Sequence, residues 1–504
     1  MKNPLFDALL APHKNNSDTF IKTDTGQNLA YKEFVSRVAT FATVISELGM
    51  SPGDRIALQV SKSVDALALC MASIQCGTVF LPLNPAYTAP EVAYFIQDSG
   101  AKLLVCPDNR QNELIEIAQG SGAELKTLNS DGTGRLAELA DFAQPRPSVT
   151  PRSPNDLAAL LYTSGTTGRS KGAMLTHENL LSNALTLADH WQFTKEDVLL
   201  HALPIFHTHG LFVATNTTLL TGGSMRFYEK FQTTDIVRDM PNATAMMGVP
   251  TFYTRLLDDP EFTKDAARNM RLFISGSAPM LAETHAQFTA RTGHHILERY
   301  GMTETNMSTS NPFNGVRKPG TVGMPLPGVE LKITDPSSGD PIPQGQIGQI
   351  EVRGPNVFQG YWNMPEKTAE ELREDGFFIT GDLASMDEDG YVTIVGREKD
   401  LIISGGFNVY PKEIEEAIDD HPDVLESAVI GIPHPDLGEA TVAIVVPQTG
   451  VDLDSEDLFA RLGSRLARFK QPREMIIVKQ LPRNTMGKVQ KAQMRSNYSN
   501  LFKP

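Results

Sequence analysis

Short apolar runs alternate with segments of helical pattern in the first quarter of the chain. The apolar runs cover residues 55–60, 78–83 and 102–106, and residues 64–75 and 89–97 lie between them with a helical pattern. Apolar runs of this length are typical of strands buried on both faces, and strands that alternate with helices form βαβ units. The pattern therefore predicts an α/β fold built on mostly parallel sheets.

The pattern changes after residue 310 and again in the last hundred residues. Strands punctuated by Gly and Pro predict a small β-rich subdomain, at residues 330–334, 349–352 and 391–395. The last part predicts a compact α+β unit with helices 412–418 and 455–468 and strands 426–431, 441–446 and 475–478.

Two segments predict the boundaries between these parts. Residues 129–155 are rich in Ser, Pro, Gly and Asp and predict a loop between an opening subdomain and the next. Residues 396–406, GREKDLIISGG, combine charged residues with glycines, a composition typical of a boundary between domains. We expect a large N-terminal domain, residues 1–398, with parallel α/β sheets and the β-rich subdomain, and a small C-terminal α+β domain, residues 399–504.

Composition excludes several classes of protein. The 504 residues include 45 basic and 60 acidic side chains, and the net charge of −15 disfavours nonspecific binding to nucleic acid or to an anionic membrane. The longest apolar stretch, residues 66–83, contains Ser73, Gln75, Gly77 and Thr78, and so predicts helix, turn and strand instead of a membrane span. Three cysteines without metal-type spacing and no recognisable export signal indicate a cytoplasmic protein.

A loop rich in glycine and hydroxyl groups follows the apolar run at residues 157–162. It reads YTSGTTGRSKG over residues 162–172, and its glycines let backbone N–H groups approach an anion while Lys171 adds positive charge. The P-loop motif requires Lys directly before Ser or Thr, whereas Lys171 precedes Gly172. The loop indicates a phosphate site of another kind, and its alternative is a polar surface turn.

Four further motifs accompany this loop. They are YGMTE at residues 300–304, TGD at 380–382, GREKD at 396–400 and PRNTMGK at 482–488. Together the five resemble, in order and spacing, the adenylate-forming superfamily of acyl-CoA synthetases, luciferases and peptide-synthetase adenylation domains. The resemblance implies that a carboxylate attacks the α-phosphate of ATP, and that coenzyme A then takes the acyl group from the adenylate.

The resemblance also implies roles for individual residues. ATP or AMP would be bound by Thr163, Ser164, Gly165, Thr166, Thr167, Gly168, Lys171, Gly276, Ser277, Ala278, Tyr300, Gly301, Met302, Thr303, Asp382 and Arg397. Thr166 and Glu304 would be ligands of Mg²⁺, which prefers oxygen ligands and keeps several waters.

The C-terminal domain would be mobile in this scheme. Lys488 would reach the α-phosphate during adenylation and act as a catalytic residue together with Glu304 and Thr166. Asp400 would be the hinge about which the domain swings. Ser404, Gly405 and Gly406 would then line the tunnel for coenzyme A.

Three polar residues bear on the choice of acid. Arg299 precedes the YGMTE motif, Ser277 occupies a position that is often apolar in the superfamily, and His207 lies in LPIFHTHGLF. A guanidinium, a hydroxyl and an imidazole can hold a second carboxylate. These segments resemble the malonyl-CoA synthetases, which implies malonate as the substrate, with methylmalonate accepted more slowly because a methyl group discriminates by only ~1–3 kcal/mol.

Several alternatives remain at this point. Arg299 can instead pair with a surface carboxylate such as Glu298, Ser277 can bond to its own backbone, and His207 can be a core or gating residue. The chain would then be a ligase for a short or medium monocarboxylic acid. Further alternatives are a nucleotide-binding relative without activity and an adenylation domain that loads a carrier protein.

Overall fold

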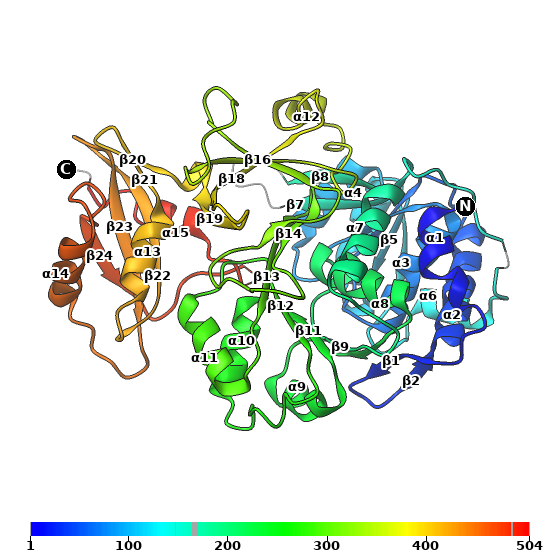
Figure 1. Ribbon diagram of the computed structural model, residues 1–504. Coiled ribbons are helices and arrows are strands. Elements are labelled where there is room, and N and C mark those ends of the chain that lie inside the picture. The colour runs from blue at the N-terminus through cyan, green and yellow to red at the C-terminus, as the bar shows by residue number, and fades with distance from the viewer. Residues whose placement is uncertain (1, 147, 164–169, 485–486, 503–504) are drawn as a thin grey trace. The chain divides into compact units, whose positions relative to one another are not determined.

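Residues 2–146, 148–163, 170–484 and 487–502 are described by the computed structural model, and they form four β-sheets (Figure 1). The chain divides into two units, Met1–Glu330 with Val352–Phe378, and Leu331–Glu351 with Ile379–Pro504. Each unit has its own sheets and its own apolar core. The predicted α/β class is confirmed.

The first unit contains a six-stranded sheet in the order β6-β5-β3-β4-β7-β8. Its strands are β3 (Arg55–Leu58), β4 (Val79–Pro82), β5 (Leu103–Cys106), β6 (Glu124–Thr127), β7 (Leu157–Thr163) and β8 (Lys171–Thr176). All neighbours are parallel except β7 and β8. The predicted strands at 55–60, 78–83, 102–106 and 157–162 are confirmed.

The same unit contains a nine-stranded sheet in the order β15-β14-β13-β12-β11-β9-β10-β1-β2. The strands are β1 (Thr19–Thr23), β2 (Asn28–Ala30), β9 (Val198–His201), β10 (Ser224–Phe227), β11 (Ala245–Gly248), β12 (Leu272–Ser275), β13 (Leu297–Met302), β14 (Asn306–Ser310) and β15 (Met324–Pro325). The run from β1 to β13 is parallel, so its carboxyl ends meet along one edge.

Helices connect and cover these two sheets (Figure 1). They are α1 (Pro4–Leu9), α2 (Tyr31–Glu47), α3 (Val64–Cys76), α4 (Ala89–Ser99), α5 (Gln111–Gly120), α6 (Arg135–Phe142), α7 (His177–His190), the π-helix η3 (His209–Thr215), α8 (Asn216–Thr221), α9 (Thr233–Asp239), α10 (Pro250–Asp258), α11 (Ala282–Thr292) and α12 (Pro365–Glu371). The predicted helices at 64–75 and 89–97 correspond to α3 and α4.

Helix α3 accounts for the longest apolar stretch of the sequence. Its N-cap Ser63 accepts a hydrogen bond from the Ala66 backbone, and Gly77 ends it in the left-handed conformation that glycine favours. Because nearly the whole helix is buried, its apolar residues surround it on all sides. Within the described part of the chain, no helix is long and apolar enough to cross a bilayer.

One prediction for the first unit was wrong, and one strand was not predicted. Residues 129–155 contain the helix α6, because Leu136, Ala137 and Ala140 place apolar groups on one face and become buried. The phosphate-loop segment leads into strand β8, antiparallel to β7, before α7 begins. The six-residue strand KGAMLT is too short and mixed for its period to be recognised in the sequence.

The second unit contains the other two sheets. The four-stranded sheet has the order β16-β17-β18-β19, with β16 (Glu330–Thr334), β17 (Gly348–Arg353), β18 (Phe378–Met386) and β19 (Val392–Arg397). The five-stranded sheet contains β20 (Ile402–Ser404), β21 (Phe407–Val409), β22 (Val424–His434), β23 (Gly438–Pro447) and β24 (Glu474–Ile477). The helices are α13 (Pro411–Asp419), α14 (Ser455–Arg465) and α15 (Lys491–Asn497).

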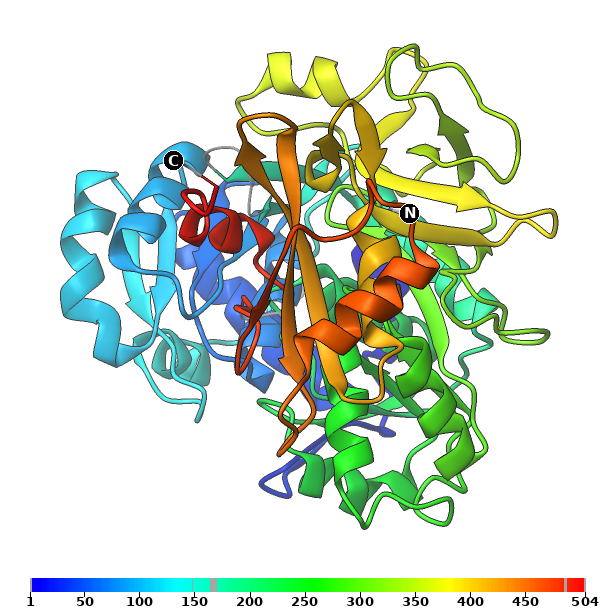
Figure 2. The same ribbon diagram turned by 90° about the vertical axis from the view of Figure 1, so that its left-hand side faces the viewer.

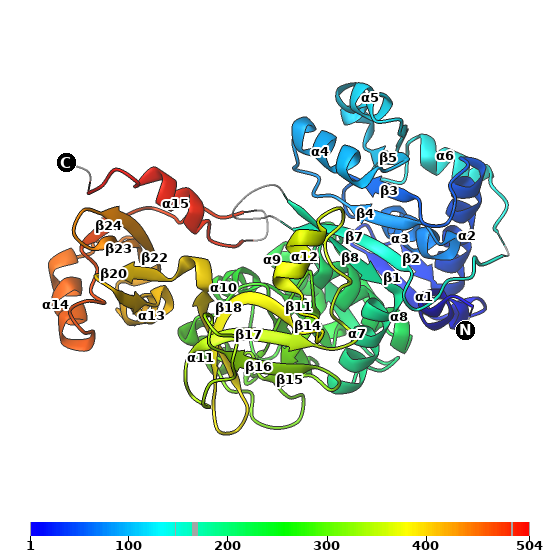
Figure 3. The same cartoon turned by 90° about the horizontal axis from the view of Figure 1, so that it is seen from above.

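The five-stranded sheet is covered by helices on both faces (Figures 2 and 3). Successive residues of a strand point to opposite faces. Val429 of β22 therefore packs with Ile414 of α13 and Leu458 of α14, whereas its neighbour Ile430 packs with Met494 of α15. The predicted compact α+β unit is confirmed.

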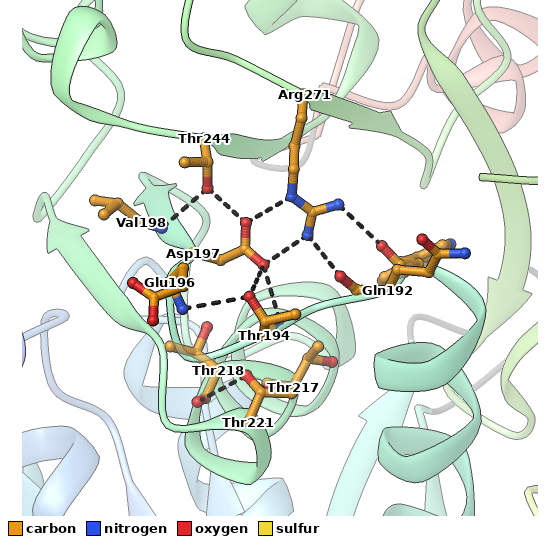
Figure 4. A network of polar contacts seen from close by, with 11 residues as sticks. Gln192, Thr194, Glu196, Asp197, Val198, Thr217, Thr218, Thr221, Thr244 and Arg271 are labelled. Atoms are coloured by element: carbon orange, nitrogen blue, oxygen red, sulfur yellow. Dashed lines mark hydrogen bonds and ion pairs between the residues drawn. The ribbon is translucent and has the colours of Figure 1, made fainter. Parts of the chain in front are cut away.

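An ion pair with a buried carboxylate joins the amino ends of three neighbouring strands of the nine-stranded sheet (Figure 4). Asp197 precedes β9, Thr244 precedes β11 and Arg271 precedes β12. The Arg271 guanidinium donates two hydrogen bonds of 2.6 Å to the Asp197 carboxylate, and the Thr244 hydroxyl donates a third of 2.7 Å. Burial by itself raises the pKa of Asp197, but these hydrogen bonds outweigh it and hold that pKa below its usual value.

We expect Arg271→Met to lower the free energy of unfolding by about 3–5 kcal/mol, because Asp197 would remain buried without a cation. In the unaltered protein, the contribution of Asp197 is complete above its unfolded pKa of about 3.9 and is lost as pH falls through the lower native value. Urea unfolding followed by tryptophan fluorescence measures this loss. The double variant Asp197→Asn/Arg271→Met should recover much of it, and a loss below about 1 kcal/mol for Arg271→Met would contradict the account.

Candidate active site

The phosphate loop connects two antiparallel strands. Thr163 ends β7, Lys171 begins β8, and the two residues pair across the ladder. The predicted nucleotide residues Ser164, Gly165, Thr166, Thr167 and Gly168 lie outside the described residues.

Lys171 lies in a cluster of charged and aromatic side chains. Its ammonium is 3.1 Å from both carboxylate oxygens of Glu371, the last residue of α12, and lies 4.0 Å from the centre of the Tyr361 ring. Burial raises the pKa of Glu371, but hydrogen bonds from Tyr361 and Lys367, together with Lys171, lower it below its usual value. Glu371 is therefore a carboxylate that holds Lys171 beside the loop.

The same tyrosine contacts Glu304, the predicted metal ligand. Glu304 is 4% exposed, and its carboxylate lies 3.0 Å from the Tyr361 hydroxyl, which is also 2.6 Å from Glu371. A phenol has one hydrogen to donate, so the two carboxylates compete for it. Burial and the two carboxylates raise the pKa of Tyr361, which keeps this hydrogen in place. Tyr361 thus links Glu304 to the Lys171 cluster.

Arg299 lies on β13, and Ser277 lies just beyond the carboxyl end of the neighbouring strand β12. The strands are parallel neighbours, with Ser275 paired to Glu298, so the residues that follow Ser275 lie beside Arg299. A Cβ atom on Gly276 would be 2.4 Å from the Arg299 guanidinium carbon, and only glycine allows this approach. Ser277 has a φ of +72°, a conformation that is strained for serine.

The Arg299 guanidinium is buried, and no counter-ion lies beside it among the described residues. Arg299 is 3% exposed, and its Nε and Nη2 find no hydrogen-bond partner in the part of the chain that the structure describes. Burial lowers the pKa of Arg299 to about 9, so the side chain is charged at pH 7. An unpaired buried cation is costly, and an anion in this position would stabilise it.

His209 completes this group of polar side chains. It is the first residue of η3, and its Nδ1 is 3.5 Å from the Ser277 hydroxyl, while its buried Nε2 has no partner within the described segments. Burial, with Arg299 as the next cause, lowers the pKa of His209 well below its usual value, so the ring is neutral. A neutral ring that accepts a hydrogen bond at Nδ1 can donate another from Nε2.

Sequence reasoning named His207 at this site and missed His209. His207 is half-buried and packs on Phe206, with ring centres 4.7 Å apart. The signal for His209 was the HTHG pattern, in which either histidine fits a polar pocket. The turn of η3 places His209, and not His207, beside Ser277, and this turn is not apparent from the sequence.

The YGMTE motif begins on β13 and turns back into β14. Tyr300 pairs with Thr309, and Gly301 lies so close to Asn306 that a Cβ atom would be 1.8 Å from its carbonyl oxygen. The remaining predicted nucleotide residues of this unit are half-buried: Ala278, Met302 and Thr303.

Other predicted residues belong to the second unit. Asp382 and Arg397 face each other across β18 and β19 in an ion pair of 2.6 Å, and the Asp382 carboxylate is buried. The hairpin of these two strands therefore brings the TGD and GREKD motifs together. Asp400, at the end of GREKD, pairs with Arg495 of α15 at 2.7 Å.

The predicted coenzyme A segment forms a tight hairpin in the second unit. Ser404 ends β20, and Gly405 and Gly406 form the turn to β21 with φ of +58° and +83°, which favours glycine. Lys488 lies in a turn in which its backbone N–H donates to Asn484, and its side chain is exposed.

Two family models match the chain. The model described as AMP-binding enzyme matches residues 11–362, and that described as AMP-binding enzyme C-terminal domain matches residues 413–488. Since the first covers more than half of the chain, the protein belongs to the AMP-binding enzymes, the adenylate-forming superfamily that the five motifs resemble.

Individual relatives indicate which kind of AMP-binding enzyme this protein is. A feruloyl-CoA synthase of an Amycolatopsis species is 36% identical over 94% of each chain. A malonate–CoA ligase of Arabidopsis thaliana is 35% identical over 90% of this chain and 79% of that protein. The crystal structure of ATP-bound MatB from Rhodopseudomonas palustris is 54% identical, with a TM-score of 0.98 over 100% of both chains. The protein is an AMP-forming acid–CoA ligase, which uses ATP and coenzyme A.

We expect Tyr361→Phe to raise the KM for ATP roughly tenfold or more, because hydrogen bonds to charged groups contribute about 1.5–3 kcal/mol and the Tyr361 hydroxyl links Glu304 to Glu371. Initial-rate kinetics at saturating acid measure the change. Tyr228→Phe is the matched control, since the Tyr228 hydroxyl also donates to a carboxylate, that of Asp239 at 2.8 Å. Equal KM values for ATP in both variants would contradict a role for Tyr361 at the nucleotide site.

Proposed function

We propose that this ligase activates malonate and transfers the malonyl group to coenzyme A. The observation that carries the proposal is the Arg299 guanidinium, buried and without a counter-ion among the described residues. A planar guanidinium can bind a carboxylate through two parallel hydrogen bonds. One carboxylate of malonate would bind here while the other reacts. The malonate–CoA ligase among the relatives supports this choice.

His209 and Ser277 would complete the carboxylate site. His209 can donate from Nε2, and the Ser277 hydroxyl lies within 3.5 Å of the same ring. A monocarboxylic acid would leave these groups and Arg299 unpaired, at a cost of about 1–3 kcal/mol for each unsatisfied buried group. Butyrate and acetate should therefore be poor substrates, and methylmalonate an intermediate one. His207, which the sequence indicated, would lie at the edge of this site.

Adenylation would use residues of both units. The free carboxylate of malonate attacks the α-phosphorus of ATP, the bond to the β-phosphate oxygen breaks, and pyrophosphate leaves. Lys171 and the loop residues would hold the phosphates, and Lys488 would neutralise the charge that develops at the α-phosphate. Magnesium would be held by Thr166 and Glu304. The buried Glu304 carboxylate suits an ion that prefers oxygen ligands and needs few from the protein, and the ion would draw negative charge from the phosphates.

Thioester formation would follow in a second arrangement of the domains. Asp382 and Arg397 would hold the ribose, and Asp400 would be the hinge between residues 1–398 and 399–504. Ser404, Gly405 and Gly406 would line the path of the coenzyme A thiol. The thiolate attacks the acyl carbon of malonyl-AMP, and AMP leaves. Three buried, unpaired cysteines suit a reducing compartment, and we place the reaction in the cytoplasm.

We expect Arg299→Met to lower kcat/KM for malonate at least about 30-fold, because loss of one partner of a buried charge pair costs about 2–5 kcal/mol. The KM for ATP should change less than about threefold, since the substitution removes a contact to the acid alone. Kinetics with malonate and with butyrate measure both effects, and the preference for malonate should disappear.

Arg317→Met is the matched control. Arg317 is also an arginine of the first unit, and its guanidinium donates to the backbone carbonyls of Pro312, Phe313 and His295. This variant should keep the malonate preference. If Arg299→Met kept it as well, the guanidinium would not select the acid and the proposal would be wrong.

A further inference from the structure

A second buried cation lies outside the residues assigned so far. Lys62 follows β3 at the carboxyl end of the six-stranded sheet, and its ammonium reaches His201, the last residue of β9 in the nine-stranded sheet. The Lys62 Nζ atom is 3.0 Å from His201 Nδ1, 2.7 Å from the His201 carbonyl oxygen and 2.9 Å from the Leu203 carbonyl oxygen. Lys62 therefore joins the two sheets of the first unit.

Hydrogen-bond chemistry fixes where the protons lie. Burial, with Lys62 as the next cause, lowers the pKa of His201 well below its usual value, so its ring is neutral. The Gly210 carbonyl, 3.0 Å from Nε2 of His201, can only accept, so Nε2 carries the hydrogen and Nδ1 accepts from Lys62. Burial lowers the pKa of Lys62, yet three acceptors surround it, and only the ammonium form has three hydrogens to donate.

His201 in turn forms hydrogen bonds with residues of the π-helix η3. Its Nε2 donates to the Gly210 carbonyl and lies 3.2 Å from the Thr215 hydroxyl, which itself donates to Gly210 at 2.9 Å. The wide turn of a π-helix is a local departure from helical geometry that occurs often at functional sites. His201 and Thr215 therefore fix the turn that begins with His209.

Close packing leaves this turn little freedom to move. A Cβ atom on Gly210 would be 2.1 Å from the Pro204 carbonyl oxygen, so the turn lies directly on the segment that follows β9. Lys62 holds that segment as well, through the Leu203 carbonyl. The Phe227 ring packs against both partners, with Lys62 Nζ 4.2 Å from its centre and the His201 ring 5.4 Å away.

We propose that Lys62 and His201 are positioning residues for the acid site. They hold the η3 turn so that His209 faces Arg299 and Ser277, and they thereby determine the preference for a dicarboxylic acid. The inference rests on the proposed function, because it concerns the same carboxylate site. Neither residue touches the acid, so their loss should change the choice of acid without changing the use of ATP.

Lys62→Met tests the proposal because it keeps the apolar stem and removes the three donors. We expect the KM for malonate to rise roughly tenfold, the KM for ATP to stay within about twofold, and the ratio of kcat/KM for malonate over butyrate to fall roughly tenfold. Steady-state kinetics of the full chain give all three values.

Arg55→Met is the matched control for a merely structural role. Arg55 begins β3, at the opposite end of the strand from Lys62, and its guanidinium also donates to three backbone carbonyls, those of Gly53, Ser99 and Gly100. The Arg55→Met variant should have a lower melting temperature, with the malonate KM and the malonate preference unchanged. The proposal is overturned if Lys62→Met lowers the melting temperature but keeps both values within about twofold of the unaltered protein.

Two substitutions of His201 keep the test decisive if Lys62→Met does not fold. The amide of His201→Gln can accept from Lys62 and donate to Gly210, whereas His201→Phe can do neither. We expect the glutamine variant to keep the malonate preference and the phenylalanine variant to lose it, and equal behaviour of the two would overturn the proposal. If the unaltered protein preferred butyrate, the proposed function itself would fail. If it preferred malonate but the preference did not depend on Lys62 and His201, only the present inference would fail.

Discussion

The burial of the Arg299 guanidinium is the constraint on which the acid site depends. A charged group removed from water requires a partner, and two of its nitrogens have none in the described part of the chain. The fold places this cation on β13 beside the carboxyl end of β12, where Gly276 allows the backbone to pass close to the guanidinium. In the proposed function, the cost of leaving it unpaired is the physical basis for selecting an acid with a second negative charge.

Polar contacts tie the scaffold around this cation together at both ends of the nine-stranded sheet. At the amino ends, the ion pair of Asp197 and Arg271 ties three strands together. At the carboxyl ends, Lys62 and His201 hold the π-helical turn. Side chains that must select between similar acids need such support, because a small displacement weakens every hydrogen bond of the site.

Much of the fold follows from patterns that are local in the sequence. Buried strands such as β3 and β5 are continuous apolar runs, and α4 shows clear helical spacing, so each was predictable. Helix α6 was not, because its few apolar residues lie in a segment dominated by loop-forming residues. The residues of the candidate site also fall into two groups, those that a local motif indicates and those that depend on packing. Motif position was enough to single out Arg299 and Ser277, whereas His209 and the contact of Lys62 with His201 depend on how distant segments pack.

The most direct test of the central claim is pyrophosphate exchange by the unaltered protein with malonate, methylmalonate, succinate, acetate and butyrate. If the buried guanidinium selects the acid, kcat/KM is highest for malonate, lower for methylmalonate, and lowest for the two monocarboxylic acids. Highest activity with butyrate would contradict the account, because the pocket would then accept an acid that leaves Arg299 without a partner.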